Sequence, residues 1–311
     1  MVAYDDLEFA EIVLGSGSDD VTVTSTHVGN TVCDSDGCPL RLLTASGIDL
    51  VDVQSIAGET VVDLGADDDV LTVGAPTTGG DELDQIDAQL TVRGDTGADT
   101  LDLDDTADAS TRVDVDPGVI TEAGLAQGGV VHTAVETVHV RLGDDDDTVN
   151  VRGTAADART ATHVHGNGGD DTFDVSGAAA LDTVTPTDHL GGDLDQVDGP
   201  VFIHGDGGVG NRLLISDRGA AAGDSAVTYD GRILTGLAPA AIHHDVTGAF
   251  GRGITMWSSE SADEISISGS DLSTVPGIRT LTTLNSGAGP DVLSLIHISE
   301  PTRPSKSSRM P

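Results

Sequence analysis

Residues 94–103, Gly94-Asp-Thr-Gly97-Ala-Asp99-Thr-Leu101-Asp-Leu103, combine a glycine-rich turn, an aspartate and two apolar residues at alternating positions. Glycine accepts the positive φ angles of tight turns, and alternation of apolar and polar residues is typical of a strand with one buried face. The stretch therefore predicts a turn that leads directly into a short strand. The same pattern recurs along the chain, with its key residue at Asp19, Asp69, Asp99, Asp147, Asp171, Asn211, Asp263 and Asp291.

These repeats predict an all-β fold. No segment sustains the 3.6-residue apolar period of a helix, whereas each turn precedes apolar residues at period two. Repeats that cannot bury a face alone stack on their neighbours. We therefore favour a repetitive β-solenoid, a β-roll-like parallel array, over the alternative of tandem β-sandwich-like repeats.

The composition limits the classes of partner. The 311 residues include 53 acidic and 14 basic side chains, for a formal net charge of -39, and aromatic residues make up 2%. Such a charge repels phosphate backbones and anionic lipids, so we expect no nucleic-acid partner and look to cations instead. No run of about 18 apolar residues occurs, so we also expect no membrane span.

Because aromatic residues are so few, the core must consist of aliphatic side chains.

A longer repeat organises the short ones. Two five-residue segments are nearly identical, Leu83-Asp-Gln-Ile-Asp87 and Leu194-Asp-Gln-Val-Asp198. The spacing of the turns predicts a first block at 1–133, a second at 134–252 and a truncated third at 253–292, with an insertion near 27–52 in the first. Cys33 and Cys38 lie in that insertion and enclose a turn-like tetrapeptide. Two cysteines that close a short loop predict a disulfide, and with it an oxidising compartment.

Composition and pattern change at the C-terminal end. Residues 293–303 read Leu-Ser-Leu-Ile-His-Ile-Ser-Glu-Pro-Thr-Arg, which resembles the translation of a transposase-type sequencing adapter. We expect residues 293–311 to be a non-native tail without a functional role.

The turns carry groups suited to a cation. Glycines allow carbonyl oxygens to point into a turn, and aspartate adds charged oxygens that suit a hard cation, Ca²⁺ better than Mg²⁺. The pattern Gly-x-Gly-x-Asp-x-apolar resembles the nonapeptide repeat of the RTX calcium-binding β-roll proteins, and the long blocks resemble large bacterial secreted β-strand-repeat proteins. Copies here are farther apart than nine residues, and Asn211 replaces the aspartate in one of them. The resemblance implies Ca²⁺ ligands at Gly15, Gly17, Asp19, Asp69, Gly94, Gly97, Asp99, Asp147, Gly169, Asp171 and Asp263.

Together these features predict a non-enzymatic structural repeat region of a secreted or cell-surface protein that folds with Ca²⁺, in an adhesin or surface scaffold. Surface polysaccharide and other cell-surface proteins are candidate partners. One alternative is a passive, salt-adapted acidic repeat whose aspartates only satisfy backbone N–H groups. A second is a carbohydrate-active β-helix enzyme, although no nucleophile elbow, phosphate loop or zinc-protease motif occurs. His163 and His165 share one strand face as a possible metal pair, but the sequence specifies no third ligand.

Overall fold

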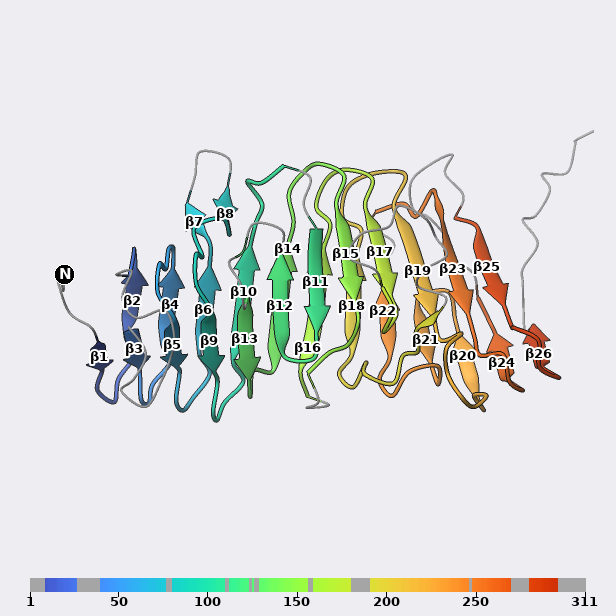
Figure 1. Ribbon diagram of the computed structural model, residues 1–311, viewed down its shortest axis with the longest axis horizontal. Coiled ribbons are helices and arrows are strands. Elements are labelled where there is room, and N and C mark those ends of the chain that lie inside the picture. Colours follow the sequence, from blue (N-terminus) through green and yellow to red (C-terminus); the bar gives the residue numbers. More distant parts are fainter. Residues whose placement is uncertain are drawn as a thin grey trace, which may run out of the picture.

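The computed structural model describes residues 9–26, 40–76, 80–109, 112–122, 125, 129–155, 159–179, 191–245, 248–269 and 280–295. These residues form 26 strands and no helix (Figure 1). Two 12-stranded sheets face each other, and a small 2-stranded sheet pairs β7 (Ala75–Pro76) with β8 (Asp81–Glu82). The all-β prediction is confirmed, and the long parallel sheets make the chain a β-solenoid.

Short strands of three to five residues build both sheets. In spatial order, the first sheet contains β1 (Ala10–Val13), β3 (Leu40–Leu43), β5 (Thr60–Asp63), β9 (Leu90–Arg93), β13 (Val130–Thr133), β12 (Val119–Glu122), β11 (Arg112–Asp116), β15 (Thr148–Val151), β17 (Thr172–Val175), β19 (Arg212–Ser216), β23 (Gly253–Trp257) and β25 (Thr282–Asn285). The second contains β2 (Asp20–Val23), β4 (Leu50–Val53), β6 (Val70–Val73), β10 (Thr100–Asp104), β14 (Thr137–Arg141), β16 (Ala161–His165), β18 (Val201–His204), β22 (Ile242–His244), β21 (Ile233–Thr235), β20 (Val227–Tyr229), β24 (Glu264–Ile267) and β26 (Val292–Leu295).

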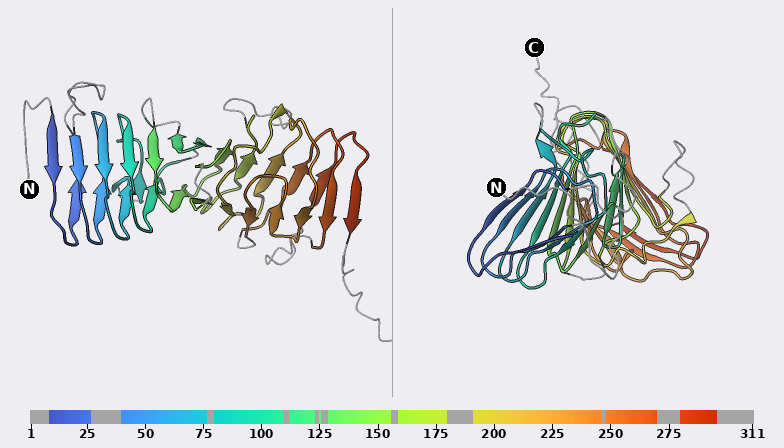
Figure 2. Two further views of the ribbon diagram at one scale, coloured as in Figure 1. Left: turned by 90° about the horizontal axis from the view of Figure 1, so that it is seen from below. Right: turned by 60° about the vertical axis from the view of Figure 1, so that its left-hand side comes forward.

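Most neighbouring strands are parallel and in register, so one rung of the solenoid lies directly on the next. For example, Leu71 of β6 is level with Val51 of β4 and with Leu101 of β10. Figure 2 shows the resulting elongated stack, with the N-terminal strands at one end and β26 at the other. The alternative of tandem β-sandwich-like repeats therefore does not describe this chain.

Two antiparallel detours interrupt the coil. β12 runs antiparallel between β11 and β13 in the first sheet, and β21 does the same between β20 and β22 in the second. Each detour adds two strands to one sheet. Because each sheet receives one detour, both sheets reach 12 strands and the two faces stay matched in length.

The core is the layer between the sheets. It consists largely of Val, Leu and Ile at alternating strand positions, and Leu71, Leu101 and Leu103 are fully buried. Few aromatic side chains enter it; Phe173, Phe250 and Tyr229 are the large ones. Stacked aliphatic rows thus replace the aromatic core of an ordinary domain, as the composition predicts.

Some sequence predictions lie outside the described residues. These are the Cys33–Cys38 disulfide and the part of the expected tail after Leu295. Within the described ranges, no helix has the length and apolar character needed to cross a membrane.

The stacked core predicts a sharp contrast between two leucines in adjacent strands. Leu71 of β6 is fully buried, whereas Leu50 of β4 is 51% exposed. We expect Leu71→Ala to lower the free energy of unfolding by about 2–5 kcal/mol because it leaves a cavity, and Leu50→Ala to change it by less than about 0.5 kcal/mol. Urea denaturation of both variants measures the difference. Equal effects would contradict the assigned strand faces.

Candidate cation sites

The repeated aspartates form rows along the edge of the stack. In the N-terminal ladder, each residue stands directly before a strand of the second sheet and its backbone N–H donates to the carboxylate of the next rung. Asp19 donates to Asp49 Oδ1 at 2.7 Å, Asp49 to Asp69 Oδ1 at 2.8 Å, Asp69 to Asp99 Oδ1 at 3.0 Å and Asp99 to Glu136 Oε2 at 2.9 Å. The side chains therefore bond one coil to its neighbour.

A central ladder repeats this arrangement before strands of the first sheet. The N–H of Asp147 donates to Asp171 Oδ1 at 3.0 Å, and that of Asp171 donates to Asn211 Oδ1 at 2.8 Å. The strands that follow this ladder, β15, β17 and β19, lie beyond the first detour in the first sheet.

A C-terminal ladder returns to the second sheet. The N–H of Asp224 donates to Asp263 Oδ1 at 2.7 Å, and the N–H of Asp263 donates to Asp291 Oδ1 at 3.1 Å. Asp263 and Asp291 stand directly before β24 and β26. The repeat motif thus has the same structural role at both ends of the chain.

Asn211 occupies a ladder position with an amide in place of a carboxylate, and its Nδ2 shows which hydrogen bonds can form where an aspartate has Oδ2. Its Nδ2 donates to the carbonyl oxygens of Gly205 at 3.1 Å and Gly207 at 3.0 Å. An ionised aspartate has no hydrogen to donate at this position. The corresponding Oδ2 atoms are buried without a hydrogen bond in Asp49, Asp69, Asp99 and Asp171. A proton or a cation at Oδ2 would supply what the amide supplies at Asn211.

The preceding glycine makes room for the buried side chain. A Cβ at Gly94 would lie 2.6 Å from Asp99 Oδ2, and one at Gly205 would lie 2.8 Å from Asn211 Nδ2. A Cβ at Gly166 would likewise collide with Asp171 Oδ2. This steric requirement accounts for the glycine five or six residues before Asp99, Asp171 and Asn211.

Burial and repulsion from neighbouring carboxylates favour the protonated form of three ladder aspartates. Burial raises the pKa of Asp69 and Asp99 to about 6 and that of Asp171 to about 7, and neighbouring carboxylates add to each shift. Successive rungs lie roughly 4.8 Å apart. Two ionised carboxylates at that spacing repel by about 3.5 kcal/mol at an effective dielectric constant of 20. A fully ionised, ion-free ladder would therefore be strongly destabilised.

The structure brings the predicted aspartate ligands into rows and not around a single point. Gly15 and Gly17 lie at the terminal rung, where an added Cβ would meet nothing within 4 Å. Gly97 and Gly169 have positive φ angles of 157° and 81°, and a Cβ on either would collide with the adjacent turn's backbone. The ladder aspartates of the predicted set are Asp19, Asp69, Asp99, Asp147, Asp171 and Asp263.

A compact group of carboxylates, which we call the Asp105 group, lies at another corner of the coil. Ligand oxygens of Asp84, Asp108 and Glu122 all lie within 4.8 Å of one another. Beside them, Asp105 is 1% exposed, and its Oδ1 accepts the N–H of Leu83 at 3.1 Å. Its Oδ2 is buried without a hydrogen bond. Burial, reinforced by the charges of Glu122, Asp108 and Asp84, raises the pKa of Asp105 to about 8.

The second Leu-Asp-Gln segment, residues 194–198, lies beside a similar group of carboxylates. The N–H of Leu194 donates to Asp217 Oδ1 at 2.8 Å, as Leu83 does to Asp105. Burial raises the pKa of Asp217 to about 8, and Asp224 and Asp195 lie close enough to raise it further. We call Asp195, Asp217 and Asp224 the Asp217 group. The repeated Leu-Asp-Gln segment can be recognised in the sequence, but the sequence alone does not show that its leucine N–H bonds Asp105 in one copy and Asp217 in the other.

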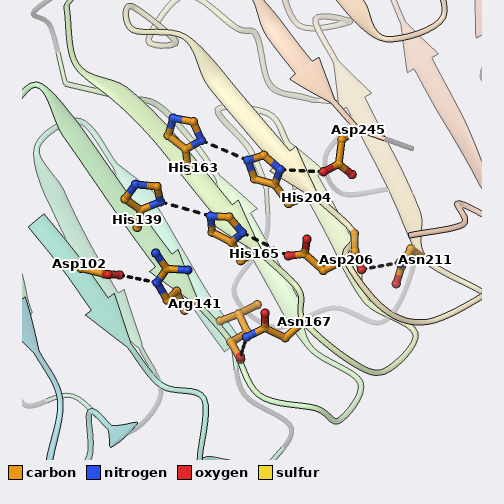
Figure 3. A network of polar contacts seen from close by, with 12 residues as sticks. Asp102, His139, Arg141, His163, His165, Asn167, His204, Asp206, Asn211 and Asp245 are labelled. Atoms are coloured by element: carbon orange, nitrogen blue, oxygen red, sulfur yellow. Dashed lines mark hydrogen bonds and ion pairs between the residues drawn. The ribbon is translucent and has the colours of Figure 1, made fainter. Parts of the chain in front are cut away.

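A third cluster lies on the outer face of the second sheet. His139 of β14, His163 and His165 of β16 and His204 of β18 gather there (Figure 3). His139 Nδ1 lies 3.2 Å from His165 Nε2, and His163 Nδ1 lies 3.1 Å from His204 Nε2. The sequence predicted only the pair within β16; neighbouring strands bring the other two.

The environment favours neutral imidazoles at His139 and His163. Burial lowers the pKa of His163 to about 4, and burial followed by the charge of Arg141 lowers the pKa of His139. The Arg141 guanidinium is itself bound to Asp102, with Nε 2.7 Å from Oδ1. Neutral imidazole nitrogens are ligands for transition metals.

Comparison with protein-family models, with curated proteins and with solved structures finds no match.

The raised pKa values predict a pH-dependent effect of Asp171→Asn. A raised folded-state pKa stabilises the fold below the unfolded pKa of about 4, and this contribution is lost as the pH rises through about 7. We expect the variant to gain stability over the wild type between pH 5 and pH 8, by on the order of 1–3 kcal/mol, since one pKa unit corresponds to about 1.4 kcal/mol. Urea denaturation in chelator at both pH values measures this gain.

Asp20→Asn is the control because it removes an exposed charge at the start of β2. A gain of equal size in Asp20→Asn, or a pH-independent effect of Asp171→Asn, would contradict a protonated ladder.

Proposed function

We propose that the chain is a calcium-binding structural repeat region of a secreted or cell-surface protein, in which Ca²⁺ neutralises buried carboxylates and completes folding. The Asp105 group is the observation that carries this proposal. It places four carboxylates together, one of them almost fully buried and lacking a hydrogen bond at Oδ2. Such a group is costly without a cation or a proton.

The geometry of the Asp105 group suits a hard divalent cation. Ca²⁺ takes 6–8 oxygen ligands at about 2.3–2.6 Å, so two oxygens on one ion lie at most about 5 Å apart. The ligand oxygens of Asp84, Asp108 and Glu122 lie within 4.8 Å of one another. Asp105 would join as a ligand after losing its proton. Ca²⁺ is favoured over Mg²⁺ because it tolerates irregular shells of many carboxylate oxygens.

The ladders extend the same argument along the stack. Their carboxylates bond successive coils, and burial raises the pKa of Asp69 to about 6 and that of Asp171 to about 7. Ca²⁺ that binds the folded chain more tightly than the unfolded chain stabilises the fold by mass action. In the absence of the ion, repulsion among carboxylates would loosen the coils. A chain exported in a loose state would then fold outside the cell, where Ca²⁺ is abundant.

The long parallel stack supports a mechanical role. A solenoid whose rungs contact only their neighbours forms an extended spacer, and Figure 2 shows this shape. A stalk or scaffold of an adhesin or surface layer uses such a spacer, with surface polysaccharide or other surface proteins as partners. The rival function is a passive acidic scaffold that needs only high salt, and the ion dependence of folding separates the two.

Calcium should therefore raise the melting temperature specifically. We expect micromolar to millimolar Ca²⁺ to stabilise the chain at pH 7.5, and Mg²⁺ or NaCl of matched ionic strength to do so far less. Asp84→Asn and Asp108→Asn should each weaken Ca²⁺ binding by about tenfold or more, corresponding to about 1.4 kcal/mol. Thermal melting by circular dichroism and calorimetric titration measure both effects.

Asp87→Asn is the matched control, because Asp87 is an exposed acid of the same segment outside the Asp105 group. Equal folding in chelator and in Ca²⁺, or equal loss of binding in Asp87→Asn, would favour the passive acidic scaffold and overturn the proposed site.

A further inference from the structure

The histidine cluster on the second sheet takes no part in the calcium proposal, and its nitrogen ligands suit a different ion. We propose that His139, His163 and His165 form a binding site for a divalent transition metal ion such as Zn²⁺. Their ligand nitrogens lie within 4.8 Å of one another. Imidazole prefers Zn²⁺, Cu²⁺ and Ni²⁺, whereas Ca²⁺ prefers oxygen.

Parallel in-register pairing creates the site from two rungs, β14 and β16, and places His204 of β18 beside it. His139 of β14 is level with His163 of β16, and His165 is level with Arg141 of β14 on one side and His204 of β18 on the other. Adjacent strands are roughly 4.8 Å apart, so the imidazoles stack, with ring centroids of His139 and His163 4.8 Å apart. The fixed strand spacing thereby pre-organises ligands from separate parts of the sequence.

The nitrogen separation between His139 and His165 matches that around a metal ion. Two imidazole nitrogens bound to tetrahedral Zn²⁺ at about 2.0–2.1 Å lie roughly 3.3–3.4 Å apart. His139 Nδ1 and His165 Nε2 are already 3.2 Å apart, where they share one hydrogen. A metal ion could replace that hydrogen with little movement of either ring.

A carboxylate orients the central ligand. His165 Nδ1 lies 3.2 Å from Asp206 Oδ2 (Figure 3). Because the carboxylate can only accept, Nδ1 carries the hydrogen and Nε2 keeps its lone pair toward His139. His204 is held in the same way, with its Nδ1 2.8 Å from Asp245 Oδ2. Carboxylate–histidine pairs of this kind fix the tautomer and raise the basicity of metal-binding imidazoles.

The charges around the site do not oppose a cation. Arg141 is level with His165, and its positive charge is paired with Asp102, whose Oδ1 lies 2.7 Å from Arg141 Nε. Asp206 and Asp245 add negative charge at the edge of the cluster. His243, which stacks on Phe202 at 4.3 Å between ring centroids, lies on the same face but outside the ligand group.

Zinc binding to the full chain, prepared without a histidine tag, tests the site. We expect one Zn²⁺ per chain at micromolar concentration in competition with a chromophoric chelator, and Co²⁺ should give the absorption bands of a nitrogen-bound ion. His165→Ala and His139→Gln should each weaken Zn²⁺ binding by at least about tenfold, and Asp206→Asn by about 10-fold or more through the orientation of His165. His243→Gln should leave the affinity unchanged.

The test separates this site from the calcium sites. Excess Ca²⁺ should not displace Zn²⁺, and Asp84→Asn should leave Zn²⁺ affinity intact, so either proposal can fail alone. The ligand side chains lie on the outer face, so we expect the variants to retain the wild-type melting temperature in chelator. No saturable Zn²⁺ binding, or equal binding by wild type, His165→Ala and His139→Gln, would overturn the proposal.

Discussion

The hydrogen bond from a turn N–H to a carboxylate on the next rung is the interaction on which the rest of the structure depends. It recurs from Asp19 to Glu136, from Asp147 to Asn211 and from Asp224 to Asp291. It helps to set the register between neighbouring strands, and the register determines which side chains pack together in the core. Parallel pairing of β14, β16 and β18 likewise brings His139 beside His163 and His165 beside His204.

This way of joining coils concentrates charge where solvent is excluded. Most of the accepting ladder aspartates use Oδ1 to bond the neighbouring rung, and Asp49, Asp69, Asp99 and Asp171 leave Oδ2 buried without a hydrogen bond. Asn211 meets the same steric demand with an amide that bonds two carbonyls. An ionised aspartate cannot donate at this position, so we expect pH and ions to affect the stability of the aspartate ladders more than that of an asparagine ladder.

The sequence was sufficient for the repeating unit because turn chemistry and period two are local. Asp99 followed by Leu101 and Leu103 predicted a turn, a strand and a buried face, and all three are present. Asp49 was missed although Gly47-Ile-Asp49-Leu-Val51 fits the same pattern. The Asp105 group and the histidine cluster could not be predicted, because their members are distant in sequence and meet only through the rung pairing and the β11–β13 detour. Local patterns do not specify which strands pair or where a detour advances one sheet.

Proton release upon calcium binding is the measurement that tests the central claim most directly, because it asks whether buried carboxyls exchange a proton for an ion. Calorimetric titration of the chain with Ca²⁺ at pH 7, in two buffers of different ionisation enthalpy, gives the number of protons released. We expect about one proton per ion bound at the Asp105 group, where the pKa of Asp105 is raised to about 8, and a smaller number in Asp105→Asn. Calcium binding without proton release, or release that Asp105→Asn leaves unchanged, would contradict the account.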